Sequence, residues 1–277
     1  MKERVMIRAL VIAVAAFGLA RSGVSAQAPA GLAREALRRS DFHWINRAAP
    51  GVRVHFLAGS YPALHQDSLI RRVLAARDTD LALLDGPAYD RTLDVFFVES
   101  RPQLQSLIGQ RATGFAQLDS AAVFLVTNPD WRAFERHEIM HILATSAWGR
   151  PAPPGAWIQE GLAQFADGAC GGFTNDAVAA GLMRRDGVIP LDTLVTRFRT
   201  LNDLAAYLDA ASVVGYVYHT YGLAAVRRLW QEGSGTAVSA LGRSLGDLEK
   251  EWRASLPDGS ALPPVERIAA IRKHGCG

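Results

Sequence analysis

Residues 137–141 read His-Glu-Ile-Met-His. On a helix, side chains three or four positions apart share a face, so His137 and His141 can point towards one metal ion, with Glu138 on the same side. Glu160 follows His141 after 18 intervening residues and offers a carboxylate as third ligand. Two imidazoles and one carboxylate with an open position are the pattern of catalytic zinc sites. The sequence therefore predicts a metal centre held by these three side chains, with Glu138 as general base.

A solvated helix that happens to carry two histidines is the simpler alternative. The apolar residues Ile139, Ile142 and Leu143 argue against it, because they make the opposite side of this helix apolar. The third ligand at a defined distance is a second argument, since chance would seldom supply both. We therefore expect the helix to be built into a core.

The spacing HExxH-x18-E resembles that of the gluzincin metallopeptidases. Residues 157–163 (WIQEGLA) are similar to the WLxEGxA segment of zinc aminopeptidases and their smaller peptidase relatives. The strong motifs lie within residues 137–163, and a looser similarity extends over about residues 96–221. The resemblance implies a zincin-like catalytic domain, in which the motif helix packs on a twisted mixed sheet and a second helix brings the third ligand. An edge strand would align an extended peptide, and residues 114–117 are expected near that edge.

The resemblance also implies a hydrolase that cleaves peptide bonds with one Zn²⁺ ion. Zinc lowers the pKa of its water towards about 7, and Glu138 would take that proton and pass it to the leaving amine. In the aminopeptidase relatives a tyrosine at the head of a helix donates to the oxyanion, and the similarity of residues 207–212 carries this role to Tyr207. A tyrosine that only buries its ring is the alternative. Tyr216 and His219 are lesser candidates for the donor.

Two departures from the family pattern limit what the resemblance implies. Gln164 stands where thermolysin-like enzymes have an aspartate that orients the first histidine, and its amide oxygen is a weaker acceptor. The GxMEN motif that reads a free amine is missing, so exopeptidase activity is not carried over. The alternative function is a catalytically silent zincin-like module of the cell envelope that binds a partner. The complete set of ligands and base favours the peptidase.

Residues 1–26 have the pattern of a secretory signal peptide. A basic start precedes a 12-residue apolar run at residues 9–20, and small residues occupy positions 24–26. An uncleaved anchor is the alternative, but the run is shorter than the roughly 20 residues that cross a bilayer. We expect an exported protein, periplasmic or extracellular, with no stable membrane span after cleavage.

The charge balance gives no sign of a nucleic-acid partner, and the cysteines fit an exported protein. The leader holds four of the 30 Lys and Arg and one of the 27 Asp and Glu, so the remainder has no formal net charge. We therefore expect no nucleic-acid partner, whereas a peptide or protein substrate is what the resemblance to the gluzincins implies. Cys170 and Cys276 are predicted to form a disulfide across 106 residues, and two unpaired thiols are the alternative.

The remaining patterns predict an α+β fold in which strands come first and helices follow. Strands are expected at residues 52–56, 93–98, 114–117 and 121–127. Helices are expected at residues 32–46, 67–77, 101–110, 156–167, 197–221 and 245–254, and one from an Asn128 cap to residue 146. We divide the chain into a signal peptide (1–26), a linker and helix (27–50), a zincin-like subdomain with the metal site (51–170), a helical subdomain (171–256) and a tail (257–277).

Overall fold

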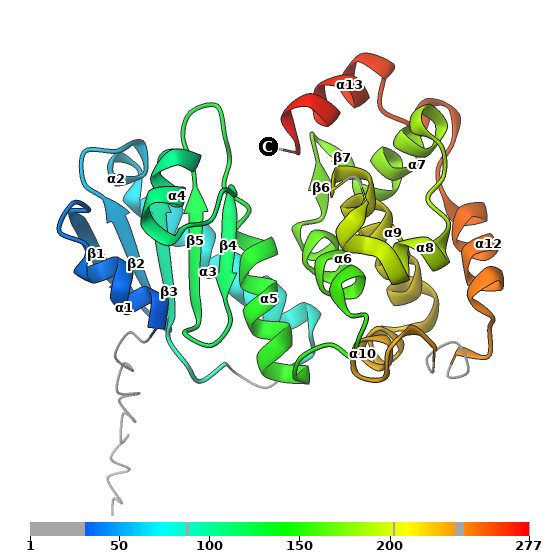
Figure 1. Ribbon diagram of the computed structural model, residues 1–277, viewed down its shortest axis with the longest axis horizontal. Helices are drawn as coiled ribbons and strands as arrows, with labels where there is room; N and C mark the ends of the chain where they lie inside the picture. Colours follow the sequence, from blue (N-terminus) through cyan, green and yellow to red (C-terminus); the bar gives the residue numbers. More distant parts are fainter. Residues whose placement is uncertain (1–30, 87–88, 202, 236–240, 277) are drawn as a thin grey trace, which may run out of the picture.

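The computed structural model describes residues 31–86, 89–201, 203–235 and 241–276. The predicted signal peptide lies outside the described residues. The fold is α+β, as predicted: a mixed sheet forms one side of the molecule, and a mainly helical half forms the other (Figure 1). None of the helices among the described residues has the length and apolar character that crossing a membrane requires.

The first half of the chain contains the sheet and the helices that pack on it. Its strands are β1 (Trp44–Ala49), β2 (Val52–Leu57), β3 (Leu93–Val98), β4 (Gly114–Gln117) and β5 (Ala122–Val126). Its helices are α1 (Gly31–Arg38), α2 (Tyr61–Leu64), α3 (Gln66–Leu83), α4 (Arg101–Ile108) and α5 (Glu135–Trp148).

The second half is helical apart from one short hairpin. It contains α6 (Ala156–Asp167), the hairpin β6 (Ala169–Cys170) and β7 (Phe173–Thr174), α7 (Asn175–Asp186), α8 (Leu191–Arg197), the 3₁₀ turn η1 (Phe198–Thr200), α9 (Asp203–Tyr221), α10 (Leu223–Glu232), α12 (Leu245–Ser255), the 3₁₀ turn η2 (Gly259–Ala261) and α13 (Val265–His274).

The sheet has the strand order β1-β2-β3-β5-β4, and β4 is one of its two edges. The strands β2, β3 and β5 are parallel, whereas β1 and β4 run antiparallel to their neighbours. Every residue of β3 and β5 is buried, which agrees with the apolar sequence of β5 and the mostly apolar sequence of β3, where Asp94 is paired with Arg53 and His55. The edge strand β4 lies beside α5, so the sheet presents a free edge to the helix that carries the predicted metal ligands.

Side chains of the central strands alternate between two cores, so both faces of the sheet are covered. Val95 and Phe97 pack with α3 and α5 in the larger core, which continues into the helical half. Phe96 and Val98 face the opposite way and pack with α1 and α4. In Figure 1, α4 accordingly lies in front of the sheet and α3 behind it.

The helical half is organised around α6, which lies between α5 and α9. A Cβ atom on Gly161 would lie only 2.8 Å from the backbone oxygen of Ala210, so α6 and α9 approach each other at this glycine. The open side of Gly161 thus faces α9 and not α5, so this glycine allows close packing within the helical half.

Two predicted elements of the first half differ from the structure. The helix predicted at residues 32–46 ends at Arg38, and residues 44–49 form β1, which pairs along its whole length with β2. The predicted cap at Asn128 is also wrong. Its side chain accepts from the backbone N–H of Asp130, and its backbone pairs with Trp131 in a turn, so α5 begins seven residues later at Glu135. At residues 44–49 the neighbouring strand β2 satisfies the backbone hydrogen bonds, and at Asn128 a local turn does so. Neither segment therefore continues as a helix.

In the helical half the predicted helix boundaries agree more closely with the structure. Helix α6 spans residues 156–167 and ends at Gly168 in the left-handed conformation, as predicted. Ser244 caps α12 by accepting from the backbone N–H of Asp247. The long helix predicted from residue 197 is instead divided by η1 and Leu201, and α9 begins at Asp203. The disulfide between Cys170 and Cys276 is present, so that prediction is confirmed.

Candidate metal centre

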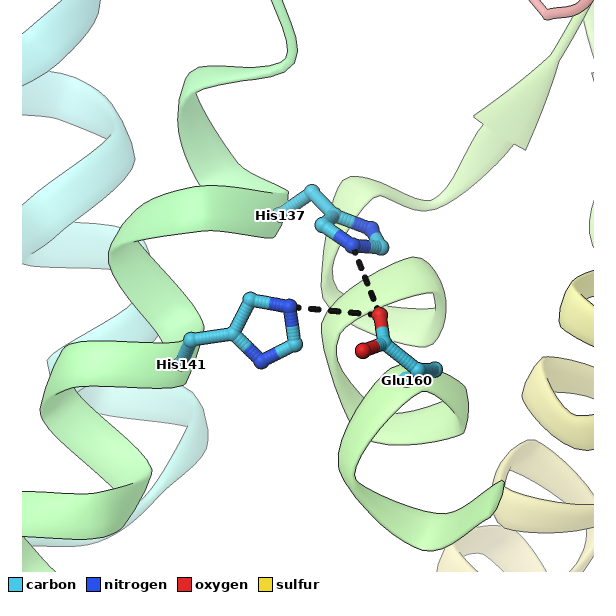
Figure 2. A group of neighbouring side chains, drawn as sticks. All are labelled: His137, His141 and Glu160. Carbon is cyan, nitrogen blue, oxygen red and sulfur yellow. Dashed lines mark ion pairs between the residues drawn. The ribbon is translucent and has the colours of Figure 1, made fainter. Parts of the chain in front are cut away.

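Helix α5 places its two histidines between the sheet and the helical half. Ile139 and Leu143 point into the larger core, which fixes the rotation of the helix about its axis. The opposite side of the helix therefore carries His137 and His141 towards α6 (Figure 2). Both imidazoles are buried, with 9% and 7% of their surface exposed.

Ion pairs with α3 hold the start of α5. Arg136 donates to the carboxylate of Asp80, which is fully buried, at 2.8 Å. Arg72 donates to Glu135 at 2.8 Å. Burial raises the pKa of Asp80 to about 7, and the charge of Arg136 offsets part of that rise. Glu135 and Arg136 both directly precede His137, so these pairs join the first turn of α5 to α3.

Glu160 of α6 lies opposite the two histidines. Its Oε2 atom is 3.3 Å from Nε2 of His137 and 3.3 Å from Nε2 of His141 (Figure 2). One ligand atom from each of the three residues lies within 4.8 Å of the others. The sequence thus located three side chains that meet in space, and this buried group could hold a metal ion.

The distances fit a metal with four ligands. For metal–ligand bonds of about 2.0–2.1 Å, neighbouring ligands of a tetrahedral ion are separated by about 3.3–3.4 Å. In an octahedral site with similar bonds the separation is shorter, about 3.0 Å. The two separations of 3.3 Å between imidazole nitrogen and carboxylate oxygen match the tetrahedral value. The residues present therefore fit a zinc-like ion by donor type and by spacing.

Glu138 lies beside this group and packs against the edge strand. Its carboxylate occupies the space that a side chain on Gly114 of β4 would fill, since a Cβ there would lie 2.9 Å from the Cδ atom of Glu138. A glycine at this position of β4 thus lets the carboxylate lie between the sheet edge and the histidines. The sequence reasoning did not identify this role of Gly114.

The carboxylates of Glu138 and Glu160 have opposite pKa shifts. Burial raises the pKa of Glu138 to about 7, with a partly offsetting effect of His137 and a further rise from Glu160. Burial would also raise the pKa of Glu160, but His141 and His137 outweigh it, and the pKa falls well below its usual range. A cation held by the ligands would favour the ionised form of both carboxylates.

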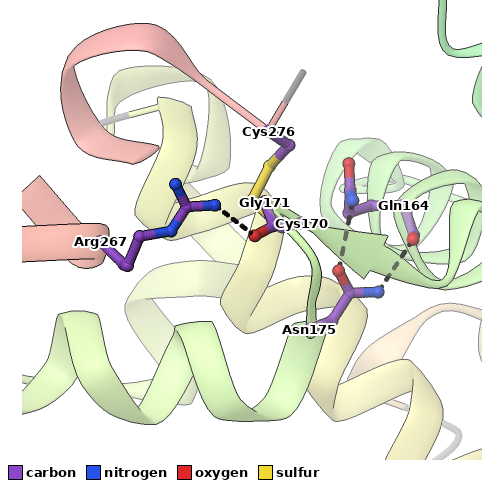
Figure 3. Close-up of a disulfide and its surroundings, with 6 residues drawn as sticks. All are labelled: Gln164, Cys170, Gly171, Asn175, Arg267 and Cys276. Carbon is purple, nitrogen blue, oxygen red and sulfur yellow. Dashed lines mark hydrogen bonds between the residues drawn. A yellow bond between two sulfur atoms is a disulfide. The ribbon is translucent and has the colours of Figure 1, made fainter. Parts of the chain in front are cut away.

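Gln164 follows Glu160 by one turn of α6 and connects it to the helical half. Its side-chain amide donates to Asn175 of α7 at 3.3 Å, and Asn175 donates back to its backbone oxygen at 3.0 Å (Figure 3). Among the described residues, no hydrogen bond joins Gln164 to His137. Gln164 is therefore not seen to orient His137, and its side-chain N–H donates to α7 instead.

Tyr207 lies in the second turn of α9 and lines the same cavity. Its ring is stacked near that of His137, with centroids 6.1 Å apart, and it also contacts Phe198 at 5.2 Å. The other two candidates lie elsewhere. The hydroxyl of Tyr216 donates to Glu251 of α12, and His219 packs on Phe165. Of the three, only Tyr207 lines the cavity with the candidate metal ligands.

The candidate site opens into a cavity of about 550 Å³ between the sheet edge and the helical half. One wall comes from α4, the residues leading into β4, and β4 itself, and the other from α6 and α9. The C-terminal tail contributes Gly275 and Cys276 to the lining. The cavity has a size that is ordinary for small-molecule and peptide sites.

The disulfide holds the tail in this place. Cys276 is bonded to Cys170, and its backbone oxygen accepts from the N–H of Gly171 at 3.2 Å. Arg267 of α13 donates to the backbone oxygen of Gly171 at 3.0 Å (Figure 3). The tail is thus tied to the hairpin that directly follows α6. The sequence predicted the bond but not that it would bring the tail to the cavity.

Comparison with models of known protein families gives no match, and comparison with curated proteins gives no significant match.

Proposed function

We propose that the protein is an exported Zn²⁺-dependent metallopeptidase of the gluzincin type, with a zincin-like catalytic domain. The observation that carries this proposal is the convergence of His137, His141 and Glu160, whose ligand atoms all lie within 4.8 Å of one another, with the carboxylate of Glu138 beside them in an open cavity. Export, to the periplasm or the extracellular space, is supported by the leader pattern of residues 1–26.

The donor set supports zinc over other common ions. Magnesium and calcium prefer oxygen ligands, whereas two imidazoles and one carboxylate suit zinc. When bound, Zn²⁺ would polarise a peptide carbonyl and make water acidic enough to attack at neutral pH. A structural zinc site would need a fourth protein ligand, and no fourth His, Cys, Asp or Glu joins the group among the residues that the structure describes.

The remaining roles follow from the chain's own residues. Glu138 would accept a proton from the attacking water and return it to the leaving amine. The free edge of β4 borders the cavity, so an extended peptide could pair with its backbone. Tyr207 is proposed as donor to the developing oxyanion, because it lines the cavity beside His137.

The test combines metal analysis with hydrolysis of a mixed peptide library. We expect one zinc per chain and cleavage that is lost on chelation and restored by zinc. Glu138→Gln should retain the metal and lose at least about 100-fold in rate, since it removes the base and leaves the ligands. One zinc per chain with no cleavage would favour the binding module, and a chain that takes up no zinc would overturn both functions.

A further inference from the structure

Two arginines line the cavity on the side of the sheet. Arg101 is the first residue of α4, and Arg111 lies in the segment between α4 and β4. The guanidinium of Arg101 lies 5.2 Å from the ring centre of Trp131, which also lines the cavity. A cation held over an indole ring is restrained in position, so it offers its N–H groups from a defined place.

The charge of these arginines is not balanced within the cavity. Other arginines of the described residues are paired with acids, as Arg53 is with Asp94 and Arg136 with Asp80. Neither Arg101 nor Arg111 forms an ion pair with any residue that the structure describes. The acidic side chains that line the cavity are Glu138 and Glu160, and both belong to the candidate metal centre. The sheet-side wall is therefore left with uncompensated positive charge.

The tail makes this part of the cavity more enclosed. A Cβ on Gly275 would lie 3.2 Å from the Trp131 ring, so the tail approaches the indole over which Arg101 lies. Gly275 and Cys276 line the cavity together with Trp131, and the disulfide to Cys170 fixes them there. Arg101 and Arg111 are themselves exposed, so a substrate that enters the cavity can reach both guanidinium groups.

We propose that Arg101 and Arg111 form a subsite that recognises a carboxylate of the peptide substrate. This inference rests on the proposed peptidase function and names its substrate class: peptides with an acidic group near the bond that is cleaved. Guanidinium groups suit this role because their N–H groups pair with the two oxygens of a carboxylate. The carboxylate could belong to an Asp or Glu side chain or to the C-terminus of the peptide.

The test uses matched peptides that differ only in charge. In the first set, the two peptides of a pair have Glu or Gln at one position near the cleaved bond, and each flanking position is tested in turn. In the second set, the two peptides differ only in having a free or an amidated C-terminus. The wild-type protein should prefer the carboxylate member of one pair by about tenfold in kcat/KM, as expected for a charged hydrogen bond near a surface. Preference within the first set identifies a side chain, and within the second a terminal carboxylate.

Arg101→Gln and Arg111→Gln should lower this preference severalfold, and the double variant should abolish it. Arg227→Gln is the matched control, since Arg227 is an exposed arginine of α10 away from the cavity. Lysine at either position should restore part of the preference. A merely structural role would lower the rates of both members of a pair equally and leave their ratio unchanged, which would overturn the proposal.

Binding separates this inference from the proposed function. Fluorescent forms of the same peptides are titrated into zinc-loaded Glu138→Gln protein, with and without the arginine substitutions. A carboxylate preference in binding without cleavage by the wild type would sink the peptidase and support the subsite. Cleavage by the wild type with no charge preference in either assay would support the peptidase and overturn the subsite.

Discussion

The two helices that supply the candidate metal ligands are held in place by different means. Helix α5 is joined to α3 by ion pairs of Arg136 with Asp80 and of Arg72 with Glu135. Apart from the contacts of Glu160 with the two histidines at the candidate metal centre, α6 has no ion pair in the structure's described residues, and it lies against α9 with Gly161 at the backbone of Ala210. One ligand helix thus depends on charge and the other on close contact. The geometry of the metal centre depends on both.

The largest expected effect is on zinc affinity, at the candidate metal centre between α5 and α6. Glu160→Ala removes the contribution of α6 and leaves the two histidines of α5, so zinc affinity should fall by more than about 100-fold. The affinity is measured by competition with a chelator. Zinc should also no longer raise the melting temperature, because that rise depends on affinity for the folded state. An affinity unchanged from the wild type would show that α6 supplies no ligand.

Close packing of α6 on α9 is tested by Gly161→Ala. The added Cβ would lie 2.8 Å from the Ala210 oxygen, which is backbone and cannot turn aside, so we expect a loss of about 3 kcal/mol in unfolding free energy. Gly246→Ala in α12 is the matched control. A Cβ there meets only Ser244 Oγ at 3.9 Å, and the exchange should be neutral or stabilising. Equal behaviour of the two variants in urea unfolding would refute the close-contact account.

The charge-dependent attachment of α5 is tested by Arg136→Met. The substitution leaves the carboxylate of Asp80 buried without its partner, and unfolding free energy should fall by about 2 kcal/mol. Arg228→Met removes an exposed pair with Glu232 and should cost less than about 0.5 kcal/mol. If urea unfolding showed the same small loss of unfolding free energy for both variants, the ion pair of Arg136 with Asp80 would not be what attaches α5 to α3.

The last test concerns the pH dependence of stability through Asp209 of α9. Burial raises the pKa of Asp209 to about 8, and the charge of Arg253 offsets part of that rise. An acid whose pKa is higher in the folded state makes the folded protein lose stability as pH rises from about 4 to 8. Asp209→Asn should therefore have almost no effect at pH 4 and should stabilise the protein increasingly as pH rises, with an upper limit of about 5 kcal/mol at pH 8, because one pKa unit corresponds to about 1.4 kcal/mol. The variant's melting temperature, followed from pH 4 to 8, checks this, and a gain that did not grow with pH would contradict it.

The sequence was sufficient where a local pattern and a strong local preference agree. The mostly apolar run at residues 93–98 and the limits of α6 follow from neighbours within one turn or strand. The ligands of the candidate metal centre belong to this class as well. Two of them lie one helical turn apart, and the third lies on the next helix, so short-range spacing already restricts them to one region.

What the sequence alone did not determine depends on partners far away along the chain. Residues 44–49 form a strand because β2 pairs with them, and Asn128 forms a turn because Trp131 closes it. Gly114 admits the Glu138 carboxylate only because β4 is the sheet edge beside α5. The tail reaches the cavity because a disulfide ties Cys276 to the end of α6. Local pattern thus determined which residues could hold a metal ion, and tertiary contact decided what surrounds them. Packing partners and cavity walls come from segments that no short window of sequence contains.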